Sequence, residues 1–213
     1  MTNDAFATCN NVFLLGSVDS EPTLSHELYG EGFYDFTVKV LRLSRQCDII
    51  PITAAKKLFE DGLPKIGDKL AIEGQFRSYN KTDGSRSKLM LTVFVKNFVS
   101  PDAHHDNPNT VELSGYICKE PIYRTTPFNR EICDLLVAVN RAFNKSDYIP
   151  CIAWGRNARF GKNLSVGTRI SVAGRIQSRE YIKKLSDDIS ETRTAYEISV
   201  GKIELDDEPC GVE

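Results

Sequence analysis

Large rings and small apolar side chains fall at alternate positions along the largely apolar stretch YIPCIAWG, residues 148–155. Because successive side chains of a strand point to opposite faces, Tyr148 and Trp154 fall on one face. The small apolar residues Ile149 and Ala153 fall on the other face, which predicts a packed core on that side. The two large rings are therefore candidates for a function at the surface.

Five runs of this kind predict strands in the C-terminal half of the chain. They are VELSGYI, ICDLLVAV, DYIPCIAW, RISVAGRIQSREY and AYEISVGKI. A short helical stretch, RNARFGKNL, falls between the third and fourth runs. This order within about 95 residues is typical of an all-β OB-fold, a Greek-key barrel whose outer face binds oligonucleotides or oligosaccharides.

The N-terminal half repeats this pattern. A shift of 99 residues lays NNVFLLGSVDSEP over NTVELSGYICKEP, and DIIPITAA over DYIPCIAW. Past residue 55 the shift becomes 100, and near the end it becomes about 105. One register that holds over about 45 residues without a gap indicates a duplication. We therefore predict two tandem five-stranded OB-fold barrels, each with one short helix between strands three and four.

The predicted domain boundaries follow from this repeat. Residues 1–100 form the first barrel and residues 109–206 the second. Residues 101–108 lie between them as a linker, which contains Pro, Asp and Asn and shows no apolar periodicity. Residues 207–213 form a short acidic tail.

Charge is distributed unevenly between the two copies. The net charge of the chain is −2, which by itself argues against a nucleic-acid partner. Residues 109–203, however, contain 15 Lys and Arg against 10 Asp and Glu, while residues 1–100 contain 12 of each. Nine of those 15 cations are Arg, which suits stacking and bidentate phosphate contacts. The second copy is therefore the better candidate for binding an anionic polymer.

Several other classes of site lack a signature in the sequence. The six Cys residues form no C-x-x-C pair, so we expect neither a structural metal nor a disulfide framework, and Cys133 and Cys151 are expected in the core. His104 and His105 lie in the linker, where solvation is a better interpretation than metal binding.

We find no nucleophile elbow or carboxylate pair typical of an enzyme, and expect no cofactor. The polar N-terminus and the lack of an apolar run of about 18 residues predict a cytoplasmic protein, in a bacterial nucleoid or a phage-infected cell.

Several blocks of the second copy, taken together, resemble a known family. NTVELSGYICKEPIYRT, DLLVAVNRAF, DYIPCIAWG, AGRIQSREY and YEISVGKI are similar, in order and spacing, to the blocks of the bacterial single-stranded DNA-binding protein (SSB) family. The resemblance implies that rings on the barrel stack against DNA bases. The matching positions are Phe143, Tyr148, Trp154 and Tyr181.

Cations next to these rings are candidates for contacts with backbone phosphates. On AGRIQSREY, Arg175 and Arg179 alternate with the inward-facing Ile176. The other candidates near the rings are Arg141, Arg156, Arg159 and Lys162. The expected function is sequence-independent coating of single-stranded DNA in replication, recombination or repair.

The first copy departs from the family pattern. Where the second copy has its four rings, the first has Ser44, Ile49, Ala55 and Lys81. It keeps Arg77, Tyr79 and Lys81 on one strand face, and these complete the list of candidate contacts. The resemblance also implies a homodimer with four barrels, because family members with two OB-folds in one chain pair. The acidic end ELDDEPCGVE lacks the apolar tip that recruits protein partners in the family.

Two alternative functions remain open from the sequence. One is an OB-fold scaffold of a replication complex with weak affinity for DNA, which the missing rings of the first copy favour. The other is an RNA-binding protein, because stacking does not read the 2′-hydroxyl.

Overall fold

Two similar sets of strands make up the structure, a computed structural model that describes residues 10–42, 44–60, 62–83, 86–101, 107–184 and 190–206. The first set comprises β1 (Asn10–Val18), β2 (Thr23–Leu28), β3 (Glu31–Leu41), β4 (Cys47–Ala55), the 3-10 turn η2 (Lys56–Leu58), β5 (Lys69–Asp83) and β6 (Arg86–Val99). The second set comprises β7 (Asn109–Ile117), β8 (Ile122–Thr125), β9 (Glu131–Arg141), β10 (Lys145–Trp154), α1 (Arg156–Gly161), β11 (Arg169–Lys184) and β12 (Ser190–Leu205).

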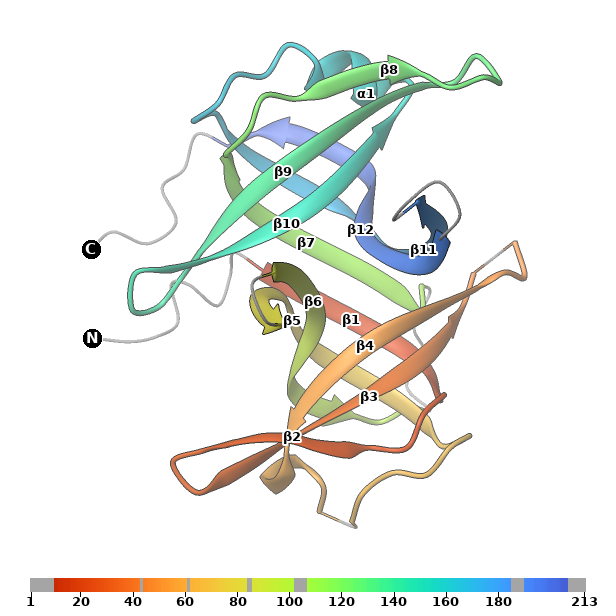
Figure 1. Cartoon of the computed structure of the whole chain (residues 1–213), viewed down its shortest axis with the longest axis vertical. Coiled ribbons are helices and arrows are strands. Elements are labelled where there is room, and N and C mark those ends of the chain that lie inside the picture. Colours follow the sequence, from red (N-terminus) through yellow and green to blue (C-terminus); the bar gives the residue numbers. More distant parts are fainter. Residues whose placement is uncertain are drawn as a thin grey trace.

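Each set closes into a ring of five paired strands (Figure 1). In the first, β1 pairs with β3 and β5, β4 pairs with β3 and β6, and β5 pairs with β6. The second set repeats these pairings with β7, β9, β10, β11 and β12. In both rings only the third and fifth long strands run parallel. The predicted all-β class with two tandem OB-folds is confirmed.

Two details differ from the prediction. Each ring carries a sixth, short strand at its edge, β2 or β8, whose side chains are almost all exposed and therefore show no alternation in the sequence. The helical stretch of the first copy forms only the 3-10 turn η2. None of its residues is buried, whereas Ala158 and Gly161 of α1 pack into the second barrel. A short helix gains most of its stability from such packing.

Register and packing reproduce the repeat at the level of single residues. Phe33 lies opposite Ala55, and Ile132 lies opposite Trp154, at the predicted shift of 99. Both β5 and β11 bulge at the same place, next to Gly74 and Gly174. Each bulge brings two backbones so close that a Cβ on the glycine would lie 2.5 Å or less from a carbonyl oxygen.

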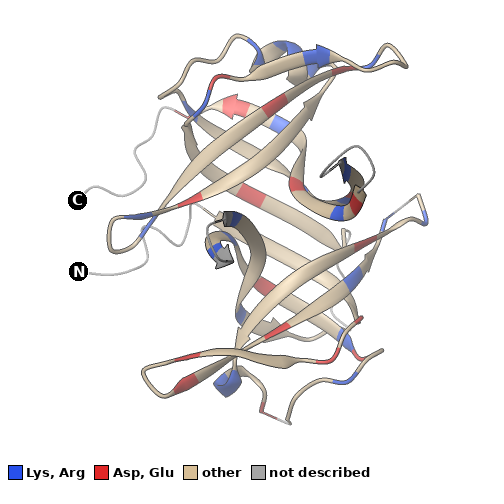
Figure 2. Ribbon diagram, viewed as in Figure 1, with Lys and Arg blue, Asp and Glu red and all other residues tan. Residues whose placement is uncertain are grey.

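The barrels join through β1 and β7, which pair antiparallel and merge all twelve strands into one sheet (Figure 1). Val12 lies opposite its own equivalent, Val111, and Leu14 lies opposite Asn109. This register relates the two barrels by an approximate two-fold axis. In Figure 2, Lys and Arg positions and Asp and Glu positions are both scattered along the strands of both barrels.

The cores lie inside the rings. Ile50, Ile72 and Phe76 are buried in the first barrel, and Ile149 and Ile176 are buried in the second. Cys133 and Cys151 are buried core residues, as predicted, and burial raises the pKa of the Cys151 thiol.

Candidate nucleic-acid interface

Two rings stand on the outer face of β10, Tyr148 at its fourth residue and Trp154 at its last. The Tyr148 side chain is 46% exposed and that of Trp154 is 38% exposed, whereas Ile149 and Ala153 between them are fully buried. Strand alternation therefore does place the rings outward and the small residues inward. Tyr148 is also tied to the first barrel, because its backbone N–H donates to Oγ of Ser78 at 2.7 Å.

The other two candidate rings lie in the turn after β9 and near the C-terminal end of β11. Phe143 is in the turn between β9 and β10, is 89% exposed, and adopts a positive φ of 63°. Tyr181 lies on β11 and is exposed, and the guanidinium of Arg179 lies 5.9 Å from its ring centroid. Four exposed rings thus line one barrel, with at least one cation directly against them.

Two of the three candidate cations near Trp154 contact neighbouring side chains. Arg156, at the start of α1, is exposed. Arg159 lies 3.3 Å from Glu131, and the Lys162 ammonium lies 5.1 Å from the Tyr123 ring centroid. These contacts are at the surface, where an ion pair contributes little stability, so a phosphate can replace them at small cost.

The cations on β11 differ from one another. Arg179 is exposed and lies 3.6 Å from Glu197, which also accepts a hydrogen bond from Gln177 at 2.8 Å. Arg175 instead reaches across to the first barrel, where its guanidinium donates to Asp48 at 3.4 Å. Ile176 between these polar residues is fully buried, as the alternation predicted.

Arg175 belongs to a polar joint between the barrels that sequence reasoning missed. The carboxylate of Asp48 is fully buried and accepts hydrogen bonds from Arg42, Arg175 and the backbone N–H of Ser178. Burial, followed by the nearby charge of Arg42, lowers the pKa of Arg175. The contact spans more than 120 residues of sequence, so local patterns could not reveal it.

The equivalent joint on the other side is looser. Asp147 accepts from the backbone N–H of Ser78 at 2.9 Å, but Nε of Arg141 lies 3.6 Å from it. That Nε is buried and has no hydrogen-bond partner in the part of the chain that the structure describes. Burial raises the pKa of Asp147, against the opposing effects of Ser78 and the nearby arginines. Arg141 is therefore held less tightly than its equivalent Arg42.

The first barrel presents a different set of rings. Arg77 lies 3.9 Å from the Phe94 centroid, and Phe94 in turn lies 5.8 Å from Phe33. Tyr79 is 44% exposed on the same face, and Lys81 is exposed. The comparison of equivalent positions missed Phe33 and Phe94, because their counterparts in the second barrel, Ile132 and Ser199, are not rings. The alternation of side chains along GFYDF and LTVFV was the signal in the sequence that could have identified these two rings.

The described residues contain no group of three or more His, Cys, Asp and Glu arranged to hold a metal ion. The linker cluster around His104 and His105 lies outside those residues, as do the tail 207–213 and most of the linker. No described helix is long and apolar enough to cross a membrane.

Comparison with known proteins gives different results for the two barrels. The sequence model of the single-strand binding protein family matches residues 108–206, which is the second barrel. This match assigns the second barrel, and not the whole chain, to the single-strand binding protein family. The chain is 40% identical over 80 residues to single-stranded DNA-binding protein 1 of Staphylococcus aureus, a match that covers 34% of this chain and 48% of the relative.

Other SSB relatives match over a similar stretch. Single-stranded DNA-binding protein A of Bacillus subtilis is 36% identical over 80 residues, which covers 34% of this chain and 46% of the relative. The chain thus spans about half the length of the curated relatives it matches.

A structural likeness extends to both barrels. The wild-type single-stranded DNA binding protein from Thermus aquaticus superposes with a TM-score of 0.66 over 94% of each chain, at 20% identity. A deletion variant of that protein gives a TM-score of 0.69 at 19% identity. At this identity the likeness establishes a shared fold, and it includes the first barrel, which the family model does not cover.

Proposed function

We propose that this chain binds single-stranded DNA without regard to sequence and protects it during replication, recombination or repair. The observation that carries the proposal is the pair of exposed rings, Tyr148 and Trp154, on the outer face of β10 in the barrel that matches the SSB family. Both rings rest on a buried apolar layer, so they need no further folding before a base can lie on them.

Stacking supplies the sequence-tolerant part of the binding energy. Every base has a π-face, and each base stacked on an aromatic side chain contributes about 1–3 kcal/mol. Phe143, Tyr148, Trp154 and Tyr181 would be the platforms. Arg156, Arg159, Lys162 and Arg179 would neutralise phosphates between them, which makes the binding sensitive to salt. No bond is made or broken, so the proposed role is binding and not catalysis.

A fluorescence-anisotropy titration with labelled oligo(dT) tests this proposal. Tight binding that weakens steeply with added salt is expected, together with weak competition by duplex DNA. An RNA oligonucleotide of the same length in the competition decides between DNA and RNA, since only RNA offers a 2′-hydroxyl. Duplex that competes as well as the single strand would contradict the proposal.

A second candidate is a scaffold with weak intrinsic affinity for DNA. It is favoured by the first barrel, where Ser44, Ile49, Ala55 and Lys81 stand at the four ring positions. A scaffold binds oligo(dT) weakly, and alanine at Tyr148 and Trp154 leaves that binding unchanged. The double replacement therefore distinguishes the two functions while the fold is monitored by circular dichroism.

We further propose that the chain forms a homodimer with four barrels, an assembly that the resemblance to two-barrel family members supports. Light scattering tests this directly. A mass of twice the 23.9 kDa of one chain is expected, and a mass of 23.9 kDa would contradict it.

A further inference from the structure

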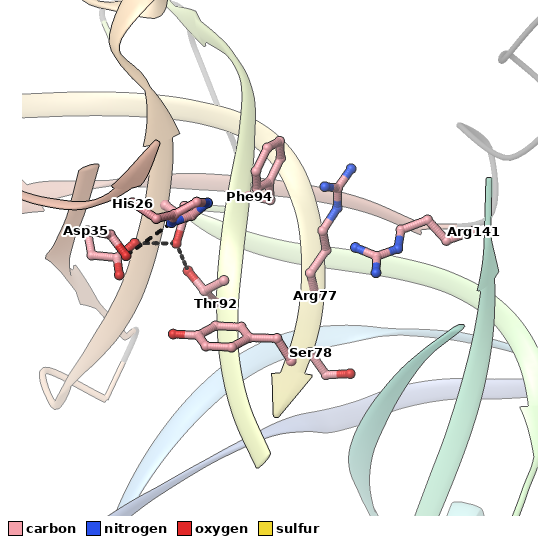
Figure 3. Close-up of a pocket in the computed structure, with 10 residues that line it drawn as sticks. His26, Asp35, Arg77, Ser78, Thr92, Phe94 and Arg141 are labelled. Atoms are coloured by element: carbon pink, nitrogen blue, oxygen red, sulfur yellow. Dashed lines mark hydrogen bonds between the residues drawn. The ribbon is translucent and has the colours of Figure 1, made fainter. Parts of the chain in front are cut away.

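The first barrel contains a pocket on its outer face, at its border with the second barrel. Its volume is about 330 Å³, at the lower end of the range for small-molecule sites. His26, Asp35, Thr92, Tyr79 and other residues of the first barrel line it, and Arg141 of β9 reaches it from the second barrel (Figure 3).

One wall of the pocket carries the carboxylate of Asp35, which can accept hydrogen bonds. Oγ1 of Thr53 donates to Oδ1 of Asp35 at 2.7 Å and lies 3.0 Å from the hydroxyl of Thr92 (Figure 3). The second oxygen of Asp35 has no hydrogen-bond partner among the described residues. The phenol of Tyr79 lies near this carboxylate: burial and then the charge of Asp35 raise the pKa of Tyr79. A carboxylate in such a place accepts N–H donors and repels carbonyl oxygens.

The second barrel has no such free carboxylate oxygen at the position equivalent to Asp35. Asp134, the counterpart of Asp35, is neutralised by Arg124 at 2.9 Å. Ile152 replaces Thr53, and Glu197 replaces Thr92. The free acceptor is thus a property of the first barrel alone and does not come with the fold.

Two arginines converge on the other side of the pocket. Arg77 lies on the Phe94 ring and donates to Gln75 at 2.7 Å, and Arg141 points toward it from the second barrel (Figure 3). Burial, followed by the charge of Arg141, lowers the pKa of Arg77 to about 10. On the opposite side of the two-fold axis, Asp48 accepts hydrogen bonds from Arg42 and Arg175. Here Asp147 forms an ion pair with Arg141 at 3.6 Å and no hydrogen bond to either Arg141 or Arg77, so both guanidinium groups keep N–H donors for an anion.

We propose that this pocket holds one guanine nucleotide of the bound strand, with its base on Asp35 and its phosphate on Arg77 and Arg141. Guanine presents two adjacent donors, N1–H and the N2 amino group, to which a carboxylate can bond with both oxygens. Thymine presents one N–H between two carbonyls, which the carboxylate repels. The inference rests on the proposed binding of single-stranded DNA, and it makes the first barrel base-selective where the second is tolerant.

Oligonucleotides of about 30 nucleotides, long enough for two OB-folds at about 4–16 nucleotides each, test the proposal. We compare oligo(dT) with the same strand carrying a single central dG, dI, dA or dC. The dG strand is expected to bind about tenfold more tightly than oligo(dT), since a bidentate contact discriminates by roughly 5- to 150-fold. Inosine lacks the N2 amino group and should lose most of the gain without any change to the protein.

Single-residue variants test whether the preference for dG arises in this pocket. Asp35→Asn should remove the preference for dG and leave oligo(dT) binding as tight or tighter, because the neutral amide does not repel the thymine carbonyls, and Arg77→Gln should weaken every strand. Asp134→Asn, the equivalent change in the second barrel, is the matched control and should keep the preference. Thermal melting verifies that each variant folds.

The outcomes separate this inference from the proposed function. No binding of oligo(dT) by the wild-type protein would refute the proposed function itself. Normal oligo(dT) binding with equal affinity for all five strands would overturn only the guanine pocket. Free dGMP that competes as strongly as the dG strand would show that the pocket serves a free nucleotide, and would also overturn the assignment to the strand.

Discussion

The two barrels share a backbone but present different outer faces, and the difference separates what the fold requires from what binding requires. In each barrel a buried Asn, Asn10 or Asn109, exchanges two hydrogen bonds with the backbone of the fourth long strand. These bonds satisfy buried polar groups, so neither copy can lose them cheaply. On the outer face, by contrast, Trp154 stands where the first barrel has Ala55.

The joints between the barrels show the same contrast. Asp48 accepts hydrogen bonds from two arginines, whereas Asp147 forms only an ion pair with Arg141 at 3.6 Å and hydrogen-bonds neither Arg141 nor Arg77. The approximate symmetry of the backbone therefore carries two chemically different sites. The following changes test this asymmetry, from the largest expected effect to the smallest.

Asp48→Asn is expected to cost on the order of 3–5 kcal/mol of unfolding free energy, because Arg42 and Arg175 would lose their shared carboxylate. Asp147→Asn should cost about 1 kcal/mol or less. The pKa of Asp147 is raised in the folded state, so its ionised form is penalised there. Its contribution to stability is present below the unfolded pKa and is lost as pH rises through the folded pKa.

Urea denaturation of both variants at neutral pH measures this difference. Asp147→Asn should also flatten the pH dependence of stability in the acid range, because it removes that titration. Equal losses for the two variants would mean that the joints are equivalent, against this account.

Gly115→Ala is expected to destabilise the protein by roughly 3 kcal/mol, since the added Cβ would lie 2.5 Å from the carbonyl oxygen of Ala138. Gly16→Ala should cost a similar amount in the first barrel, where the equivalent oxygen of Lys39 is also 2.5 Å away. Gly201→Ala, whose new Cβ would come no nearer than 3.4 Å to a neighbour, is the control. Thermal denaturation gives the ranking, and a neutral Gly115→Ala would refute the close packing of β7 on β9.

Tyr148→Ala should weaken oligo(dT) binding by about 2 kcal/mol, within the range for one stacked base. The equivalent change in the first barrel, Ile49→Ala, removes no ring and should leave the affinity within a few tenths of a kcal/mol. Trp154 fluorescence reports binding in both variants. Equal losses would place the stacking face somewhere other than on the second barrel.

Arg156→Gln is expected to have the smallest effect, a decrease of about 0.7 in the slope of log affinity against log salt, the value for one phosphate contact on a single strand. Its counterpart Lys56→Gln should leave the slope unchanged. A slope that responds to Lys56 and not to Arg156 would assign the phosphate path to the first barrel instead.

Local patterns in the sequence were enough to predict the barrels and the outward rings. Strand alternation placed Tyr148 and Trp154 opposite Ile149 and Ala153, because one face of a barrel strand is always core. The short strands β2 and β8 escaped prediction, since their side chains are nearly all exposed and leave no apolar period.

Features that depend on distant contacts could not be predicted. Asp48 meets Ser178, and Asp147 meets Ser78, only after the barrels have docked. Likewise, the pocket joins Asp35 and Thr92 to Arg141 from three separate strands. Sequence comparison between the copies pointed to missing rings in the first barrel, but it could not show that other side chains had built a different site there.

Emission from Trp154, the sole tryptophan of the chain, tests most directly whether bases lie on the second barrel. Titration with oligo(dT) should quench this emission until the site is saturated, and added salt should reverse the quenching as the strand dissociates. Emission that stays constant while an anisotropy signal shows that the strand is bound would contradict the account, because the strand would then lie away from the indole.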